Sequence, residues 1–324
     1  MFSPPTPPRT RPRRAALFAA GVLIAAAGFA HTQAPPRFAF ASQSHARAVL
    51  GELDTYVRAT AALERSVKLR TSEAVDEDRF ASALAATALA WTDDEQRALS
   101  EVLRGLASFI ATMRWQAPST IFIVKASDRL LEGLPHTRGT AIVLQQGVLR
   151  QALRDAALLT YLLSHEAFHG LSRNNPALRE ELYAAIGFQA CSSLDMPSTL
   201  ANLRVTNPDA PENRHTIVLR HGGQMLEMLP FVHFRSDAID PSAGFPAQTR
   251  TSWLHVTRQQ GRCTVAGQST QVDLEAVFER IGRNTNYYIH PEEILADNFA
   301  LLFRRPQSVA SPGVLERIEK ILRR

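Results

Sequence analysis

The chain has 324 residues, of which 45% are hydrophobic and 21% charged, and its formal net charge is +5. This length and apolar fraction are enough to bury a sizeable core in one large domain or two closely packed lobes. The excess positive charge comes from the N-terminus, because residues 1–30 hold four of the 36 basic residues and none of the 31 acidic ones. The remainder is nearly neutral, which excludes a general bias toward nucleic acid or an anionic membrane surface.

Residues 1–30 have the pattern of a secretory signal peptide. Four arginines precede an Ala-rich apolar stretch at 15–30, which ends in small residues that suit signal peptidase. We expect cleavage after Ala30 and a periplasmic or secreted protein. The stretch is short for a stable membrane span, so none is expected after cleavage. A retained signal anchor is one alternative, and the Arg13-Arg14 pair leaves twin-arginine export open as a second.

The segment 31–43, which contains two adjacent prolines, predicts a linker, and a single domain is expected over 44–324. Apolar residues of its first part, 44–115, recur with a helical period. We expect helices at 44–68, 75–90 and 93–112. Two short β-branched and aromatic runs follow, and they predict strands at 120–124 and 140–144.

His165, Glu166 and His169 spell the motif HExxH. Apolar residues between 146 and 163 recur at spacings of three and four, which predicts that the motif lies on a helix. Residues four apart share a helix face, so both imidazoles can reach one metal ion while Glu166 points at its water. The uncharged neighbours of the motif argue against the alternative, an exposed amphipathic helix. The pattern predicts a Zn²⁺ site with Glu166 as the general base.

A catalytic zinc needs a third protein ligand and one open position. Metzincin spacing is excluded, because Ser172 and Asn175 stand where Gly and His are required. A second helix is expected at 288–304, and there Glu293 and Asp297 share a face. Glu293 is the expected ligand, with Asp297 accepting a hydrogen bond from the far nitrogen of a ligating His. The alternative explanation for Glu292 and Glu293 is that acidic residues are favourable in the first turn of any helix, where they meet the positive end of the helix dipole. Rival third ligands are Glu180, Glu181, His233 and His290.

HExxH followed by Glu293-Ile294-Leu295-Ala296-Asp297 resembles the gluzincin metallopeptidases, and the second motif is similar to the ExxAD of the CaaX-prenyl-protease type. The resemblance covers about 25 residues. It implies an α+β, mainly helical fold with a zincin-like core, in which His165, His169 and Glu293 bind zinc. Glu166 is then the base and Asp297 the outer partner. Gluzincins usually lay the substrate along a sheet-edge strand beside the active-site helix. Here that strand is expected at 139–145, and an ordinary core strand is the alternative.

A long insert at about 192–275 separates the two halves of the site. Its first part, 192–215, is rich in Ser, Asn, Pro and Asp, which predicts a surface loop. Strands are expected at 216–219, 231–234 and 252–256. The insert either shapes the cleft or shields it. Cys191 and Cys263 are expected to pair in an oxidising compartment, with two buried thiols as the alternative. Further helices are expected at 176–190 and 313–323.

These features together predict a secreted or periplasmic zinc peptidase that acts on a peptide or protein. A donor for the developing oxyanion is still required beside the zinc. The candidates are Tyr183, Tyr287, Tyr288 and His255. Two other functions stay open: a catalytically silent zinc-binding protein with a structural or partner-binding role, and an enzyme for cell-wall peptides.

Overall fold

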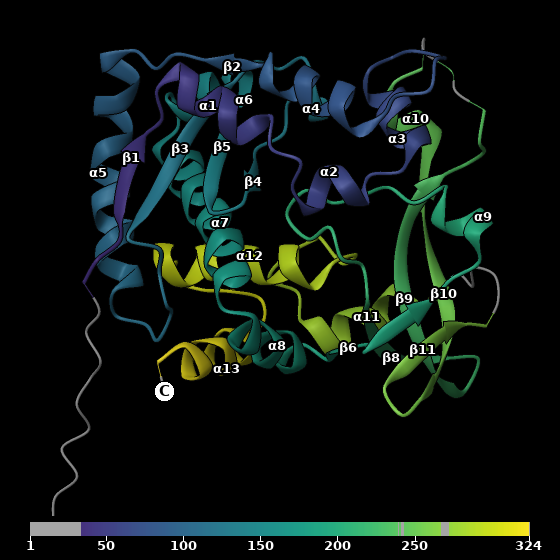
Figure 1. The fold of residues 1–324 in the computed structure, drawn as a ribbon. Coiled ribbons are helices and arrows are strands. Elements are labelled where there is room, and N and C mark those ends of the chain that lie inside the picture. The colour runs from purple at the N-terminus through teal and green to yellow at the C-terminus, as the bar shows by residue number, and fades with distance from the viewer. Residues whose placement is uncertain (1–33, 239, 241–242, 267–271, 324) are drawn as a thin grey trace, which may run out of the picture. The chain divides into compact units, whose positions relative to one another are not determined.

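The computed structural model describes residues 34–238, 240, 243–266 and 272–323, which form two sheets and their covering helices (Figure 1). The predicted signal peptide, 1–30, lies outside the described residues. In the part of the chain that is described, none of the helices combines the length and apolar character needed to cross a membrane. Helices hold more residues than strands, and the α+β class is confirmed.

The first sheet consists of the strands β1 (Arg37–Phe40), β2 (Ala88–Leu89), β3 (Thr120–Ala126), β4 (His136–Arg138) and β5 (Ala141–Gln145). It contains a parallel core of β1, β3 and β5 with two short antiparallel strands, β2 and β4. The order is β1-β3-β5-β4, and β2 pairs with β3. β4 runs antiparallel to β5. The linker prediction is wrong for residues 37–40, which pair with β3. The expectation of an edge strand at 139–145 is also wrong, because β5 has a neighbour on both sides and β4 forms the edge.

Both faces of this sheet are buried. The helices before and around it are α1 (Gln43–Leu50), α2 (Thr55–Ala59), α3 (Ala62–Lys68), α4 (Glu77–Ala85) and α5 (Asp93–Ile110). Ile121 and Ile123 of β3 belong to the core that includes α5, whereas Val124 belongs to the core formed with α1, α2 and α4. The helical stretch expected at 44–68, with one interruption at Thr60, is three short helices, and α2 does end at Thr60. The stretch is also broken before α2, because Asp54 caps this helix by accepting a hydrogen bond from Val57 N at 3.1 Å.

The HExxH helix starts later than the apolar pattern suggests. Instead of one helix from 146 onward, α6 (Gln146–Ala152) is followed by α7 (Ala156–Asn174). Asp155 separates them, since its carboxylate accepts hydrogen bonds from Ala157 N and Leu158 N. α7 packs against α12, which crosses it in the centre of Figure 1. The remaining helices of this part are η1 (Leu131–Gly133), α8 (Pro176–Ala185), α11 (Leu274–Ile281), α12 (Pro291–Arg304) and α13 (Pro312–Leu322).

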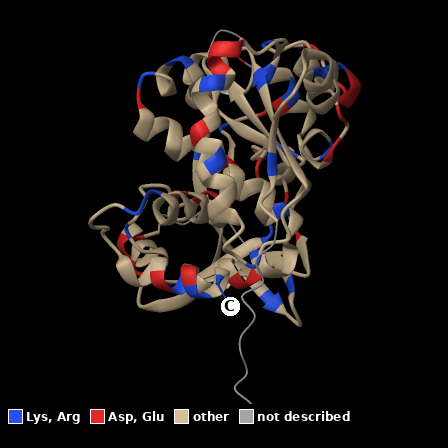
Figure 2. Ribbon diagram, turned by 90° about the vertical axis from the view of Figure 1, so that its left-hand side faces the viewer, with Lys and Arg blue, Asp and Glu red and all other residues tan. Residues whose placement is uncertain are grey.

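The insert and β6, which lies just before it, form a second, six-stranded sheet of order β6-β8-β9-β10-β11-β7. Its elements are β6 (Phe188–Ala190), β7 (Ser193–Asp195), α9 (Ser198–Ala201), β8 (His215–His221), β9 (Gln224–Phe234), α10 (Phe245–Gln248), β10 (Thr249–Gln259) and β11 (Arg262–Val265). The three strands expected here are confirmed. The predicted disulfide is also confirmed: Cys191 and Cys263 are bonded, with their Cα atoms 5.7 Å apart. In the view of Figure 2, basic and acidic residues are interspersed over the described elements.

His136 on the edge strand β4 should make stability depend on pH. Its imidazole is buried, and this burial lowers its pKa to about 3. In the unfolded chain a His has a pKa of about 6.5, so between these values only the unfolded chain binds the proton. The free energy of unfolding therefore falls as pH falls, by about 1.4 kcal/mol per pH unit.

We expect the loss of unfolding free energy from about pH 7 to about pH 5 to be about 2 kcal/mol smaller in His136→Gln than in the wild type. Urea denaturation of both proteins, with a chelator present, measures this difference. The same pH dependence in both would contradict a neutral His136 in the folded protein.

Candidate metal centre

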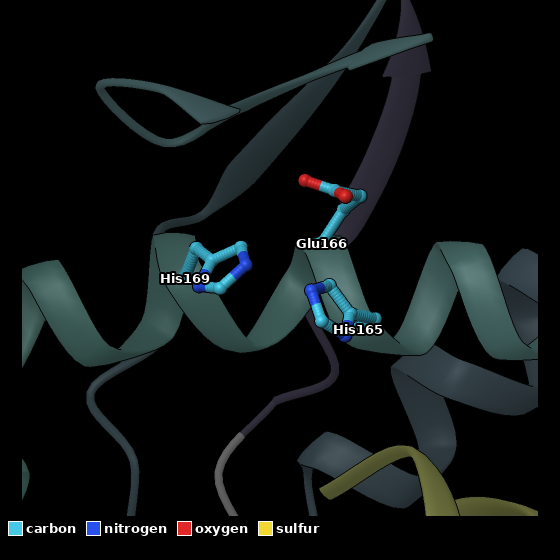
Figure 3. A group of neighbouring side chains, drawn as sticks. All are labelled: His165, Glu166 and His169. Atoms are coloured by element: carbon cyan, nitrogen blue, oxygen red, sulfur yellow. The ribbon is translucent and has the colours of Figure 1, made fainter. Parts of the chain in front are cut away.

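The two histidines of HExxH lie on one face of α7. Figure 3 shows their rings next to each other along the helix, with the Glu166 carboxylate projecting toward the strands drawn above it. The helix is held in place by Leu163, Phe168 and neighbouring apolar residues, which are fully buried in the main core. His169 is 0% and Glu166 3% exposed, so the motif is inside the protein and the exposed-helix alternative is wrong.

α12 brings Glu293 to both imidazoles across a distance of more than 120 residues in sequence. Glu293 Oε2 lies 3.1 Å from His165 Nε2 and 3.6 Å from His169 Nε2. Two ligands of a tetrahedral zinc are about 3.3 Å apart when the metal–ligand bonds are about 2.0 Å. Glu293 Oε1 accepts a hydrogen bond from Asn207 Nδ2 at 2.7 Å, which leaves Oε2 directed at the imidazoles.

The contact expected between Asp297 and an imidazole is present. Asp297 Oδ1 is 2.9 Å from His165 Nδ1 and accepts a hydrogen bond from Tyr161 at 2.5 Å. Thr285 donates to the other carboxylate oxygen. Burial would raise the pKa of Asp297, but the hydrogen bond and charge of His165 lower it. An ionised Asp297 places the proton on Nδ1 of His165, so Nε2 is the nitrogen free to bind a metal.

Glu292 has the same relation to His169, a role that the sequence pattern did not predict. Its Oε1 lies 3.0 Å from His169 Nδ1, while Oε2 accepts hydrogen bonds from Ser172 Oγ, at 2.8 Å, and from the Tyr183 hydroxyl. The carboxylate is 2% exposed. The helix dipole alone therefore does not explain Glu292, because an acid placed only to meet the dipole would keep its carboxylate in water. The one sequence signal for it was an acid adjacent to the expected ligand.

The donor set fits a zinc ion. His169 Nε2 is buried, and among the described residues it has no hydrogen-bond partner. Buried imidazole nitrogens normally have one, because leaving such a group unpaired costs about 1–3 kcal/mol. His165, Glu166 and His169 offer ligand atoms within 4.8 Å of one another. Two imidazoles and one carboxylate match the ligand types of catalytic zinc sites.

No protein-family model, curated protein or solved structure matches this chain.

The candidate metal centre brings three carboxylates close to the imidazoles of His165 and His169. The carboxylates are those of Glu166, Asp209 and Glu293. Burial, together with the negative charge of Asp209, raises the pKa of Glu166 to about 8. Burial opposes protonation of His169, but Asp209 and Glu293 raise its pKa to about 9. Burial, and after it the negative charge of Glu293, likewise raises the pKa of Asp209 to about 6. A divalent cation would relieve this repulsion and replace the protons on the imidazoles, so metal binding should release protons.

Residues 203–213, which we name the capping segment, cover the centre. The prediction that 192–215 forms a surface loop is wrong. Instead the region includes β7 and α9, and Asp209 is buried. Asp209 offers a ligand atom within 4.8 Å of those of His169 and Glu293. Nothing local marks it in the sequence, since it is one acid in a polar run.

The rival ligands have other partners. Glu180 accepts a hydrogen bond from His215, and Glu181 forms an ion pair with Arg114. His233 is 2.9 Å from Ser252 Oγ on the second sheet. His290 caps α12, where its Nδ1 accepts a hydrogen bond from Glu292 N.

Of the oxyanion candidates, Tyr287 lies beside the centre. Tyr183 binds Glu292 behind His169, Tyr288 packs on Phe278, and His255 lies on β10 opposite Met228. Tyr287 lines a pocket that is also lined by two candidate metal ligands, His165 and Glu293. The lining residues are Tyr161, His165, Thr285, Asn286, Tyr287, Glu293 and Asp297. The pocket makes Tyr287 the candidate with access to a bound substrate.

Proposed function

We propose that this protein is a zinc-dependent peptidase of the gluzincin type, exported from the cytoplasm. The observation that carries the proposal is the convergence of Glu293 Oε2 on the Nε2 atoms of His165 and His169, at 3.1 and 3.6 Å. The carboxylates behind both imidazoles support it, because such partners fix the tautomer of ligating histidines. The Cys191–Cys263 disulfide supports export to an oxidising compartment.

The chain's own residues have distinct roles in this proposal. When bound, zinc supplies a Lewis acid for the scissile carbonyl and lowers the pKa of an attacking water. Glu166 takes the proton from that water and delivers it to the leaving amine. Asp297 and Glu292 hold the two imidazoles, and Tyr287 donates to the developing oxyanion.

The substrate class follows from the edge strand. β4 is the antiparallel edge of the first sheet, and its Thr137 Oγ1 lies 3.3 Å from Glu166 Oε2. A peptide added to this edge would pass over the general base, as in other cases of β-strand addition. This role belongs to β4 rather than to residues 139–145. The substrate is therefore a protein or peptide in extended conformation, with cell-wall peptides as a subset to test.

Zinc content tests the proposal. The wild type should bind one zinc per chain, and Glu293→Ala should bind it more weakly by a factor above about ten, since even outer partners cost this much. Glu181→Ala is the matched control, because Glu181 is a rival ligand that forms an ion pair with Arg114 instead. Competition with a chelating dye measures the affinities, and circular dichroism confirms folding. Equal zinc affinity in the wild type and Glu293→Ala would reject Glu293 as a ligand.

A catalytically silent zinc-binding protein is the second candidate, and one observation favours it. The capping segment covers Glu166 and His169, which are 3% and 0% exposed, so an extended peptide does not reach Glu166 in this conformation. The two candidates differ in whether substitution of Glu166 changes turnover.

A further inference from the structure

The capping segment is built into the site by contacts along its length. At its start, Val205 N donates to Val232 O at 2.9 Å and Phe234 N donates to Leu203 O at 2.8 Å, so 203–205 lies beside β9. Thr206 N then donates to the buried carboxylate of Glu64 on α3 at 2.9 Å. The segment is therefore held by the second sheet and by the helical N-terminal part before it reaches the metal centre.

The middle of the segment contacts the residues of the proposed site. Asn207 Nδ2 donates to Glu293, as described above, and Asn207 Oδ1 accepts from Asp209 N at 2.9 Å. Arg173, at the end of α7, donates to Asp209 O at 2.9 Å. These bonds fix the backbone on both sides of Asp209 and direct its side chain inward.

The Asp209 carboxylate lies between the metal centre and the edge strand. Its Oδ1 accepts a hydrogen bond from Thr137 N of β4 at 2.6 Å. This amide is directed away from β5, at the free edge of the sheet, where a substrate carbonyl would bind in strand addition. A ligand atom of Asp209 is also within 4.8 Å of those of His169 and Glu293. The imidazole nitrogen of His169 that faces this space is the buried one without a hydrogen-bond partner.

We propose that Asp209 is a fourth protein ligand of the zinc and occupies the position that the attacking water needs. The inference rests on the proposed function. Structural zinc sites have four protein ligands, whereas catalytic sites keep one position open. With Asp209 bound, the centre is closed and the Thr137 amide is taken, so the peptidase is latent. Movement of residues 203–213 away from α7 opens both the metal and the edge strand.

Cobalt(II) in place of zinc tests the ligand, because its visible absorption reports the number and kind of ligands. We expect the spectrum of the wild type to be unchanged by azide. Asp209→Ala should have a different spectrum that shifts when azide binds, and its zinc affinity should fall by about tenfold or more. Glu212→Gln is the matched control, since Glu212 is an exposed acid of the same segment that pairs with Arg214. It should behave as the wild type.

A second variant separates a ligand from a structural contact. Asp209→Asn keeps an oxygen that can accept the Thr137 hydrogen bond, but it replaces an anionic ligand by a neutral one. A changed cobalt spectrum in this variant supports ligation. A wild-type spectrum in Asp209→Asn, with a change only in Asp209→Ala, overturns the proposal and makes Asp209 a loop contact. Thermal unfolding of the metal-free proteins checks that each variant is folded.

Turnover separates this proposal from the function on which it rests. Quenched fluorescent peptides and muropeptides should be cleaved faster by zinc-loaded Asp209→Ala than by the wild type. If the cobalt spectra are as expected but no substrate is cleaved, Asp209 remains a ligand and the peptidase assignment fails. Cleavage by a wild type whose spectrum responds to azide overturns the role of Asp209 and leaves the peptidase intact. No metal in any of the proteins overturns both.

Discussion

Glu166→Gln should reduce peptide hydrolysis by roughly 100- to 10 000-fold, the contribution of a general base to such reactions. Gln has nearly the same shape as Glu, but its amide cannot accept the proton of the attacking water. In the proposed site Glu166 is the base and not a ligand, and its Oε2 lies 3.3 Å from Thr137 Oγ1 of β4. Its substitution should therefore leave the zinc affinity close to that of the wild type.

The comparison is made in two backgrounds, the wild-type chain and Asp209→Ala, because the second should have the open site. Peptide cleavage is measured at saturating zinc, and the metal content of every sample is determined. Thr55→Ala is a suitable matched change, since Thr55 lies on α2 outside the proposed ligands and the base. If Glu166→Gln retains full turnover in the background that cleaves peptide, zinc and Glu166 do not form the proposed catalytic pair. If no background cleaves peptide, the catalytically silent alternative is favoured.

Removal of the disulfide should lower the free energy of unfolding by about 4 kcal/mol, from the loop-closure entropy of the unfolded chain. Cys191 and Cys263 are 72 residues apart in sequence and connect the start of the second sheet to β11. The double variant Cys191→Ala/Cys263→Ala is the appropriate change, because both side chains are buried and Ala adds no unpaired polar group. Urea denaturation of the metal-free proteins measures the difference.

A reducing agent provides the internal control. It should destabilise the wild type to about the level of the double variant and leave the double variant unchanged. Zinc should still bind to the folded double variant, because His165 and His169 lie on α7 and Glu293 on α12, outside the disulfide-closed loop. Any fall in zinc affinity would come from Asp209, which lies inside that loop. A stability loss below about 1 kcal/mol would mean that the disulfide adds little constraint to the unfolded chain.

The two halves of the site were predictable because each depends on helical spacing. Four residues separate His165 from His169 and Glu293 from Asp297, and on a helix this spacing alone brings side chains to one face. The meeting of Asp297 with His165 followed from the same reasoning. Glu292 was misread because its acid at a helix start has a local explanation, whereas its burial against His169 depends on how α12 crosses α7.

The sheet was predicted strand by strand, but its order was not. Alternating and β-branched residues identified β3 and β5, yet they do not tell which strand is at the edge. β4 has only three residues. It is the edge because it pairs with β5 on one side and ends the strand order. The composition of residues 37–40 predicts a linker for the same reason, since β1 becomes a strand only by pairing with β3, more than 80 residues later.

The sequence by itself determined the candidate ligands, the candidate general base, the α+β class and the cysteine pair, because residue type and short-range periodicity carry that information. Only the tertiary structure decided that residues 203–213 cover the centre and that Asp209 points into it. A polar run without periodicity has the composition of a surface loop. The position of residues 203–213 depends instead on hydrogen bonds to Glu64, Thr137 and Glu293. These partners lie 142, 72 and 86 residues away in sequence from the residues that they bind.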